Sequence, residues 1–362
     1  MEAEKRRCVG IDLGKREYTM VIIGKKMDIH KGKTSMQGRV ALYRLLEKGD
    51  KIALEAGNMA FLMAREIQSR VGSQVRVLNS AKLPIVWDAP TKTDKEDAMK
   101  LARLMEERRD EKLPLVALPS EQEMERREVI ANHGREMSGR TRVINTLHSL
   151  FLKQGHPEVV RKDLATVEDA REAIKILTGQ VREDAEWQIK HLELYERRIK
   201  ELKGKIRAEA NNDEDMKLLQ SIAGVGPVVA YAFVAHVGDG SRFSKGAQVS
   251  NYLGFVPRLD YSGTIQRQGH ITKRGNGYLR GLIVQAAWST IRCRKGGALK
   301  ERYLYQTKIQ GKSKKKTIVS IGRRLAELMY TVLQNKTKYE ARPWKGPPDK
   351  VAAGLAIQAM VV

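Results

Sequence analysis

Residues 8–23, CVGIDLGKREYTMVII, place a carboxylate inside what reads as the first strand of a sheet. CVGIDLG alternates apolar residues with small or polar ones, and YTMVII is a continuous apolar run rich in β-branched residues. The pattern therefore predicts two short strands joined by a turn. Asp12 then lies in the centre of the first strand, between Gly10 and Gly14. A carboxylate in an apolar strand is unfavourable unless it is paired or binds a metal. We therefore expect a polar site on this strand.

The remainder of the first 115 residues alternates helix and strand. KIALEAG and QVRVLN have strand character, whereas MQGRVALYRLLEKG, NMAFLMAREIQSRVG and TDKEDAMKLARLMEERRD have helical apolar spacing. Several strands followed by such an alternation indicate an α/β domain with a mixed sheet. We place this domain at residues 6–115.

From about residue 120 to 210 the strand signal disappears. SEQEMERREVIANHGREMSGRTRVINTLHSLFLKQG predicts one long basic helix, with Gly134 and Gly139 as weak points in its middle. Further on, apolar residues recur at 3-4-3-4 spacing at Leu192, Tyr195, Ile199, Leu202 and Ile206. Short heptads of this kind predict a helical hairpin or a coiled-coil arm. Residues 116–212 are therefore expected to be a helical linker.

Residues 213–335 are expected to form a second, mostly helical domain, followed by a loosely held tail at 336–362. In this domain LLQSIAGVGPVVAYAFVAHVGDGSRF predicts a helix-hairpin-helix with its turn at Gly224 and Gly226. Backbone N–H groups in such a turn bind a nucleic-acid phosphate without reading sequence. A plain helical hairpin with a glycine turn is the alternative. Residues 245–330 have mostly helical patterns with two glycine-rich loops.

Three further acids resemble Asp12 in their placement. Glu55 lies in the strand IALEAG, and Asp94 and Asp97 lie three residues apart at a helix start. Two strands and one helix that contribute four carboxylates are a recurring arrangement for binding Mg²⁺, with Mn²⁺ as the alternative ion, around a scissile phosphate. Taken singly, Asp12 could be an acid bonded to backbone amides, and Asp94 could be only a helix cap.

The charge distribution points to a nucleic-acid partner. The chain carries 67 Lys and Arg against 43 Asp and Glu, a net charge of +24. Residues 251–350 alone hold 22 basic and 5 acidic residues, whereas residues 101–250 balance at 25 each. Such a surplus repels itself unless a polyanion neutralises it. A basic surface kept for solubility is the alternative, and a membrane surface is disfavoured because no amphipathic helix collects the charge.

Other compositional features narrow the class. Only two cysteines occur, Cys8 and Cys293, which excludes a disulfide scaffold and fits the cytoplasm. No apolar run approaches the ~20 residues of a membrane span, and no signal-peptide pattern opens the chain. The seven histidines lack the spacing of zinc ligands.

A polar loop in the C-terminal third combines a serine with cations. Ser262 is surrounded in sequence by basic residues expected to bind nucleic acid, namely Arg258, Arg267, Lys273, Arg274 and Arg280. A serine hydroxyl that attacks a phosphodiester needs neutralising charge nearby, which these residues can supply. By composition alone Tyr-Ser-Gly is a turn. The run Lys314, Lys315 and Lys316 is expected to contact phosphates.

Taken together, these motifs resemble the Insertion Sequence 110 family of transposases, DEDD-type recombinases related to the Piv DNA invertases. GIDLGK, ALEAGN and KTDKEDAMKLARL are similar to the family's N-terminal RuvC-like, RNase H-like domain. SIAGVGPVVA, RFSKGAQVSNYLGFVPR, SGTIQRQG and ITKRGNGYLRGLIVQAA are similar to its C-terminal transposase domain. The resemblance extends from about residue 8 to residue 330.

The resemblance implies a DEDD metal site at Asp12, Glu55, Asp94 and Asp97, and Ser262 as a nucleophile that becomes linked to DNA. It further implies donor and target DNA as substrates and a guide (bridge) RNA encoded by the element. The subunits are expected to form dimers that join into tetramers, and the location to be the prokaryotic, nucleoid-associated cytoplasm. One departure is Ala223, where the family usually has proline before the first glycine of the turn. Ser250 and Ser244 remain alternatives to Ser262.

Two other functions are compatible with the same residues. A RuvC-like junction nuclease would use the four acids without a covalent intermediate. A non-catalytic RNA- or DNA-binding protein would retain the four acids as an inactive site. GIDLGK by itself is also similar to the first strand of sugar kinases and actin-like ATPases, whose second phosphate loop and adenosine motif we do not find in the sequence.

Overall fold

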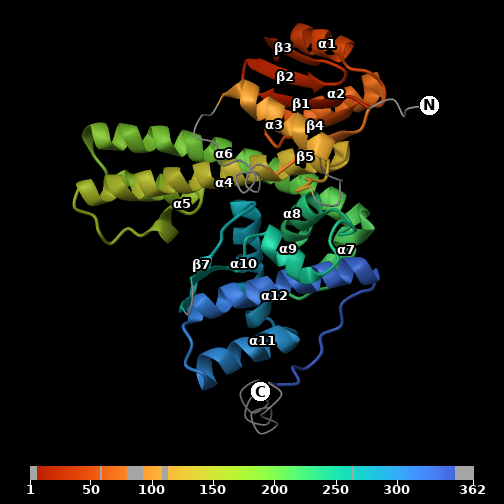
Figure 1. Cartoon of the computed structure of the whole chain (residues 1–362). Coiled ribbons are helices and arrows are strands. Elements are labelled where there is room, and N and C mark those ends of the chain that lie inside the picture. The colour runs from red at the N-terminus through yellow and green to blue at the C-terminus, as the bar shows by residue number, and fades with distance from the viewer. Residues whose placement is uncertain (1–5, 58, 80–92, 108–112, 263–264, 347–362) are drawn as a thin grey trace. The chain divides into compact units, whose positions relative to one another are not determined.

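The computed structural model describes residues 6–57, 59–79, 93–107, 113–262 and 265–346, and between residues 259 and 268 only the backbone is described. The chain divides into two compact units, residues 1–120 and 121–362, and the first of them runs from red to orange in Figure 1. Among the described helices, none combines the length and apolar character that a bilayer crossing requires.

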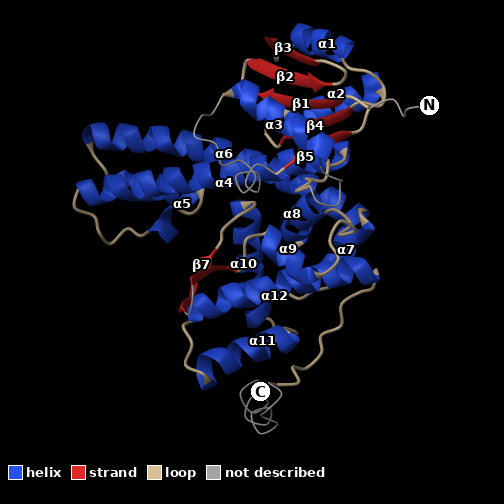
Figure 2. Cartoon of the chain, in the orientation of Figure 1, coloured by secondary structure: helices blue, strands red, loops and turns tan. Residues whose placement is uncertain are grey.

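A mixed five-stranded sheet forms the centre of the first unit (Figure 2). Its strands are β1 (Cys8–Leu13), β2 (Glu17–Ile23), β3 (Met27–Lys33), β4 (Lys51–Glu55) and β5 (Val75–Leu78). They lie in the order β3-β2-β1-β4-β5. β2 pairs antiparallel with both β1 and β3, whereas β1, β4 and β5 are parallel. The predicted α/β domain with a mixed sheet is therefore confirmed.

Helices cover both faces of this sheet. They are α1 (Met36–Leu45), α2 (Ala60–Val71) and α3 (Asp94–Glu107). Side chains alternate between the faces of a strand, so Val9 and Ile11 of β1 join a core with α1 and α2. Cys8 joins a separate core with Leu101 of α3. The alternation in CVGIDLG therefore decides which residues of β1 face α3.

β3 has no counterpart in the sequence prediction. Its sequence, MDIHKGK, lacks apolar alternation, and most of its residues are exposed. The strand lies at the sheet edge and is held by antiparallel pairing with β2 from Glu17↔Lys33 to Ile23↔Met27. Backbone pairing, which leaves no trace in side-chain pattern, explains why it was missed.

The second unit begins with two long antiparallel helices, α4 (Glu121–Lys153) and α6 (Gly179–Asn212), which extend together in Figure 1. Between them lie η4 (Arg161–Leu164), α5 (Val167–Ala173) and η5 (Ile174–Ile176). Four residues of the predicted seam on α6 are buried, and the fifth, Tyr195, is partly buried. The seam packs within one chain, so the observed form is the helical hairpin.

Gly134 and Gly139 do not interrupt α4, because aromatic rings occupy the space that side chains there would need. A Cβ on Gly134 would lie 2.9 Å from the ring of Tyr278. A Cβ on Gly139 would overlap the ring of Tyr195 on α6. These glycines permit close approach to the helix and explain why a weak helix former occurs there.

The remaining elements of the second unit form one large core that includes Tyr231, Phe233 and Leu325. They are α7 (Glu214–Gln220), α8 (Pro227–Val237), α9 (Gly246–Tyr252), β6 (Pro257–Ser262), β7 (Ile265–Ile271), α10 (Gly277–Arg292), α11 (Gly297–Leu304), η6 (Tyr305–Ile309) and α12 (Lys314–Asn335). The β6–β7 hairpin differs from the glycine-rich loop expected there, since its strands satisfy each other's backbone groups without needing an apolar pattern.

The segment after α12 is more closely held than predicted. The backbone N–H of Trp344 donates to Glu301 of α11 at 2.7 Å, and its ring lies edge-on to Tyr305 with centroids 5.1 Å apart. The backbone N–H of Ala298 donates to the carbonyl of Arg342 at 2.9 Å. The expectation of a loose tail is therefore wrong for this part, and residues 347–362 lie outside the described residues.

Candidate catalytic site and nucleic-acid interface

Asp12 and Glu55 extend from neighbouring parallel strands. In the register of β1 and β4, Gly10 lies opposite Ala53, and each acid follows its strand's small residue by two positions. Because side chains alternate, each acid shares the face of the small residue before it. Ala53 belongs to the core beneath α3, so both carboxylates leave the sheet on the side that α3 covers.

The first turn of α3 contributes Asp94 and Asp97. Thr93 precedes the helix, and its hydroxyl accepts a hydrogen bond from the backbone N–H of Glu96 at 3.3 Å, as an N-cap residue does. Thr93, not Asp94, therefore takes the capping role. Asp97 is buried, with 8% of its surface exposed, whereas Asp94 is exposed.

Gly10 allows α3 to lie directly against β1. A Cβ at this position would overlap the carbonyl oxygen of Ala98 and lie 2.5 Å from the backbone nitrogen of Ala102 and 2.8 Å from the Cβ of Leu101. Two of these three atoms belong to the helix backbone, so no side-chain rotation could relieve them. Ala98 follows Asp97 directly, so the contact that needs glycine also holds the acidic turn close to Asp12.

Asp12 lies within electrostatic reach of the three other acids. Burial raises the pKa of Asp12 to about 6, and the negative charges of Asp94, Asp97 and Glu55 add to the rise. A hydrogen bond from the backbone of Leu13 opposes the rise without cancelling it. An acid satisfied by backbone amides alone would have a lowered pKa. That alternative therefore does not describe Asp12.

The donor set suits a divalent cation, although the coordination sphere is not complete. Carboxylate oxygens are the ligands that Mg²⁺ and Mn²⁺ prefer. Among the described residues, no three acidic, histidine or cysteine side chains are gathered closely enough to enclose one ion. Asp97 also lies 3.8 Å from the ammonium group of Lys100. The three other carboxylates thus act on Asp12 through their charge, and a divalent cation bound among the acids would replace that repulsion with attraction.

The predicted helix-hairpin-helix is formed by α7, a turn and α8. Gly224 has a φ of 91°, and a Cβ there would lie 2.5 Å from the backbone nitrogen of Thr290 on α10. The Thr290 hydroxyl donates to the carbonyl of Ala223 at 2.8 Å, which fixes the turn without the proline. Gly226 is the N-cap of α8, and nothing in the described residues lies within 4 Å of its absent Cβ. Gly224 therefore packs the turn, and Gly226 is the open position.

Ser262 is the last residue of β6 and pairs with Ile265 of β7. Its side chain and that of Arg267 lie outside the described residues, as does Gly263. Of the alternatives, Ser250 is fully buried and its hydroxyl donates to Glu327 at 3.1 Å, so it cannot reach a phosphodiester. Ser244 is exposed, and its backbone N–H donates to the side chain of Gln248 at 2.9 Å, next to the start of α9.

The predicted basic residues near the hairpin differ in their surroundings. Arg258, Lys273 and Arg274 are exposed. Arg280 donates from Nη1 to the carbonyls of Leu253 and Arg274 at 3.1 and 3.2 Å, and burial lowers its pKa. Arg280 therefore braces the loop, while the other three are available to solvent.

Lys314, Lys315 and Lys316 occupy the first turn of α12 and are all exposed. Positive charge is unfavourable at a helix N-terminus, by typically about 0.3–1 kcal/mol per residue. A bound polyanion would reverse that effect, which is consistent with the predicted phosphate contact.

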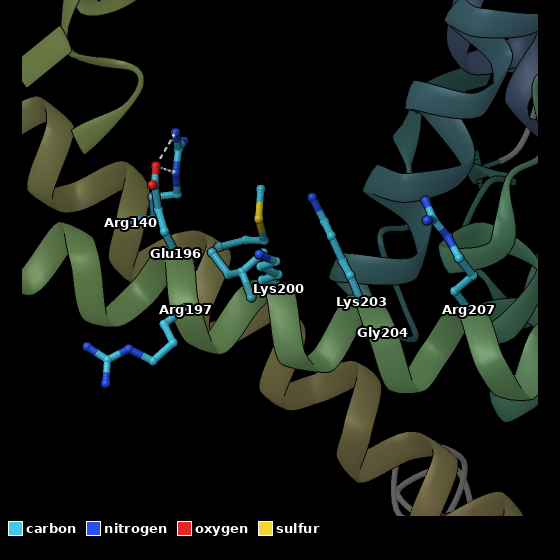
Figure 3. A pocket seen from close by; sticks show the side chains of 9 residues that line it. Arg140, Glu196, Arg197, Lys200, Lys203, Gly204 and Arg207 are labelled. Carbon is cyan, nitrogen blue, oxygen red and sulfur yellow. Dashed lines mark hydrogen bonds and ion pairs between the residues drawn. The ribbon is translucent and has the colours of Figure 1, made fainter. Parts of the chain in front are cut away.

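The helical hairpin carries a basic cleft that the sequence did not reveal. Arg140 of α4 and the α6 residues Lys200, Lys203 and Arg207 line it (Figure 3). The balanced charge of residues 101–250 concealed it, because basic residues gather on one face while acids lie elsewhere. The 3- and 4-residue spacing of the cations along α6 is the signal that could have found it.

Comparison with known proteins places the chain among transposases. A family model described as Transposase IS116/IS110/IS902 family matches residues 216–304. A protein named Probable family 20 transposase from Pseudomonas aeruginosa is 26% identical over 80% of this chain and 85% of that protein. The transposase for insertion sequence element IS1111A of Coxiella burnetii is 31% identical over 37% of each chain. The pilin gene-inverting protein of Moraxella bovis is 24% identical over 70% of this chain and 69% of that protein. Residues 216–304 thus match the IS116/IS110/IS902 transposase family, and the chain is similar to transposases and to a pilin gene-inverting protein over up to 80% of its length.

Proposed function

We propose that this chain cuts and rejoins DNA strands, using a divalent cation held by Asp12, Glu55, Asp94 and Asp97 and the hydroxyl of Ser262. The observation that carries the proposal is that Asp12 and Glu55 leave neighbouring parallel strands on the face that α3 covers, while the first turn of α3 contributes Asp94 and Asp97. The raised pKa of Asp12 is consistent with this arrangement. Such a cluster of carboxylates is unfavourable by itself and is typical of functional sites. The sheet order β3-β2-β1-β4-β5, with β2 antiparallel to the rest, supports the RNase H-like assignment.

The chemistry divides between the acids and the serine. When bound, Mg²⁺ would neutralise the charge of the scissile phosphate. The Ser262 oxygen attacks phosphorus and loses its proton, and the bond from phosphorus to one deoxyribose oxygen breaks. That oxygen leaves as a hydroxyl after gaining a proton, and the strand remains linked to the serine. A hydroxyl from another strand end then reverses the reaction, which joins the strands and restores the serine.

The basic residues are proposed to hold the substrates. The exposed Arg258, Lys273, Arg274 and the lysines of α12 would neutralise phosphates, with Arg267 as a further candidate. The open position at Gly226, at the N-terminus of α8, would bind one further phosphate. A guide RNA and an assembly of dimers into a tetramer belong to the proposal through the family resemblance, and the surplus of positive charge accommodates the RNA.

Ser262→Ala is expected to eliminate the covalent protein–DNA adduct. Wild-type protein is incubated with labelled element-end DNA, guide RNA and Mg²⁺, then denatured and run on a gel, where it should carry the label. Ser262→Ala should carry none, because it lacks the attacking oxygen. Ser244→Ala, which removes an exposed hydroxyl from the same unit, is the matched control and should form adduct at the wild-type level. Adduct formation by Ser262→Ala would assign the linkage to another residue.

A junction nuclease is the second candidate, since the whole acidic set lies in the first unit and would suffice for hydrolysis. The same experiment separates the two functions. Mg²⁺-dependent cleavage that is unchanged in Ser262→Ala and leaves no adduct would establish the nuclease and exclude strand transfer by the serine.

A further inference from the structure

We infer that the cleft on the helical hairpin binds the phosphate backbone of a DNA duplex. The cleft has a volume of about 1030 Å³ and lies along α6, with Arg140 and Met137 of α4 at one side. Its lining shares no residue with the acidic site, the Gly224–Gly226 turn or the basic residues near β6 and β7. The inference rests on the proposed function only for the choice of DNA as the ligand, and the site itself is argued from charge and geometry.

The cleft is strongly positive. Five basic side chains and one carboxylate line it. The carboxylate, Glu196, already pairs with Arg140 at 3.3 Å, and Arg140 also donates to the carbonyl of Ala165. This pair is drawn with dashed lines in Figure 3. The other cations in the cleft therefore keep their full charge, which needs an anionic partner.

Several cations elsewhere on α6 are paired with carboxylates. Arg182 pairs with Glu186 at 3.2 Å and Arg198 pairs with Glu201 at 2.9 Å, as on an ordinary solvated helix. Within the described part of the chain, no ion pair involves Lys200, Lys203 or Arg207. Three unpaired cations that share one face of a helix are suited to bind a polyanion there.

The side chains are also directed together. Figure 3 shows Lys203 and Arg207 rising from the same side of α6, while Arg197 points the opposite way. The positive charge of Lys203 contributes to lowering the pKa of the buried His133 on α4, after the larger effect of burial. The charge of Lys203 therefore acts toward the interior of the hairpin as well as toward solvent.

Gly204 supports a close-lying ligand. It lies in the interior of a 34-residue helix, where glycine is unfavourable. Nothing in the described residues lies within 4 Å of its absent Cβ, so packing does not require it. Lys200 and Arg207 are four residues before it and three after it, so the three share one face. A glycine between two cations lets the phosphate backbone of a bound nucleic acid approach the helix closely.

The dimensions and lining favour a duplex backbone. Lys200 and Arg207 are seven residues apart, a rise of about 10 Å along the helix. Phosphates of one strand advance about 3.4 Å each along a DNA axis, so the cations can follow about three of them. The described residues that line the cleft include no aromatic side chain, and stacking on aromatic rings is how proteins bind unpaired bases.

The test compares two double variants in EDTA, so that metal-dependent cleavage plays no part. Lys203→Gln with Arg207→Gln removes two cations from the cleft. Arg198→Gln with Lys205→Gln removes two from elsewhere on the same helix. Binding of a labelled 30-base-pair DNA is measured by fluorescence anisotropy from about 0.05 to 0.2 M salt. Two lost phosphate contacts should reduce the salt slope by about 1.8 and the affinity by about tenfold, and the control should match wild type.

A second variant tests the approach to the helix. Gly204→Ala should raise the melting temperature by about 1–3 °C and yet weaken DNA binding, because the methyl group favours the helix but obstructs the backbone. Equal affinity and salt slope in the cleft variant and its control would overturn the inference. So would a loss confined to a structured RNA of equal length. Failure of the proposed function would appear separately: wild-type protein would bind DNA in EDTA but show neither cleavage nor a covalent adduct when Mg²⁺ is added.

Discussion

Asp12→Asn is expected to reduce Mg²⁺-dependent strand cleavage by at least about 1000-fold, while DNA affinity in EDTA stays within about twofold. Asparagine keeps the shape of the side chain but cannot supply the negative charge with which Asp12 would help to hold a divalent cation. The measurement is cleavage of labelled DNA over time, with anisotropy as the binding readout. Asp28→Asn, an exposed acid on β3, is the control and should cleave normally.

The same substitution should stabilise the metal-free protein at pH 7. Asp12 is ionised there, above its folded pKa of about 6 and within reach of three other acids. Because the folded pKa is raised, the protonated carboxyl favours the folded state. This contribution is fully present below about pH 4, where the carboxyl is protonated, and is lost as the pH rises through 6 and the carboxyl ionises. Removing the charge should therefore contribute about 1–2 kcal/mol at pH 7, after a reduction for solvent screening, and nothing below about pH 4.

Thermal unfolding in EDTA checks this sign. Asp12→Asn should melt several degrees above wild type at pH 7, and the two should converge near pH 4. Added Mg²⁺ should raise the melting temperature of wild type but not of the variant. A variant that is less stable than wild type at pH 7 without metal, or that retains cleavage, would show that Asp12 is a structural acid.

Gly10→Ala is expected to destabilise the first unit by about 3 kcal/mol or more, a loss of roughly 10 °C in its melting temperature. The new methyl group would meet the backbone of Ala98 and Ala102, and a helix backbone cannot rotate aside. α3 must then move away from β1 and carry Asp94 and Asp97 away from Asp12. Cleavage should fall as well. Measuring it below the melting temperature of the variant distinguishes displacement of the acids from simple unfolding.

Gly24→Ala provides the matched control. A Cβ on Gly24 would lie 3.4 Å from the flexible side chain of Arg7, and its φ is not in the left-handed region. We expect a change of free energy of unfolding within about 0.5 kcal/mol and normal cleavage. If Gly10→Ala unfolds and cleaves like Gly24→Ala, α3 does not depend on that contact to hold its acids.

Several elements could be read directly from residue patterns, and others could not. β1 and β2 have apolar alternation, and α3 has strong helical periodicity, so each was predicted close to its observed bounds. β3 and the β6–β7 hairpin are held by backbone hydrogen bonds between partners, which side-chain patterns do not record. Gly134 and Gly139 are weak points of the helix predicted for α4, whereas the rings of Tyr278 and Tyr195 make glycine the fitting residue.

The candidate site divides in the same way. The presence of Asp12 and Glu55 in apolar strands, and of two acids in one helical turn, was evident from residue type and spacing because burial of an unpaired charge is so unfavourable. The roles of Thr93 as the cap and of Ser250 as a buried partner of Glu327 required the contacts themselves. The cleft on α6 required them too, because equal numbers of acids and bases in a stretch say nothing about which face each occupies.

The sequence by itself determined the type of the elements with a clear apolar pattern, such as β1, β2 and α3, and the chemistry of the groups they carry, since these depend on neighbours a few residues away. Only the tertiary structure decided that the charges of Glu55, Asp94 and Asp97 act on Asp12, and that α3 lies against the bare backbone of Gly10. Electrostatic repulsion and steric overlap act over a few ångströms in space, and the chain distance between two residues does not report that separation.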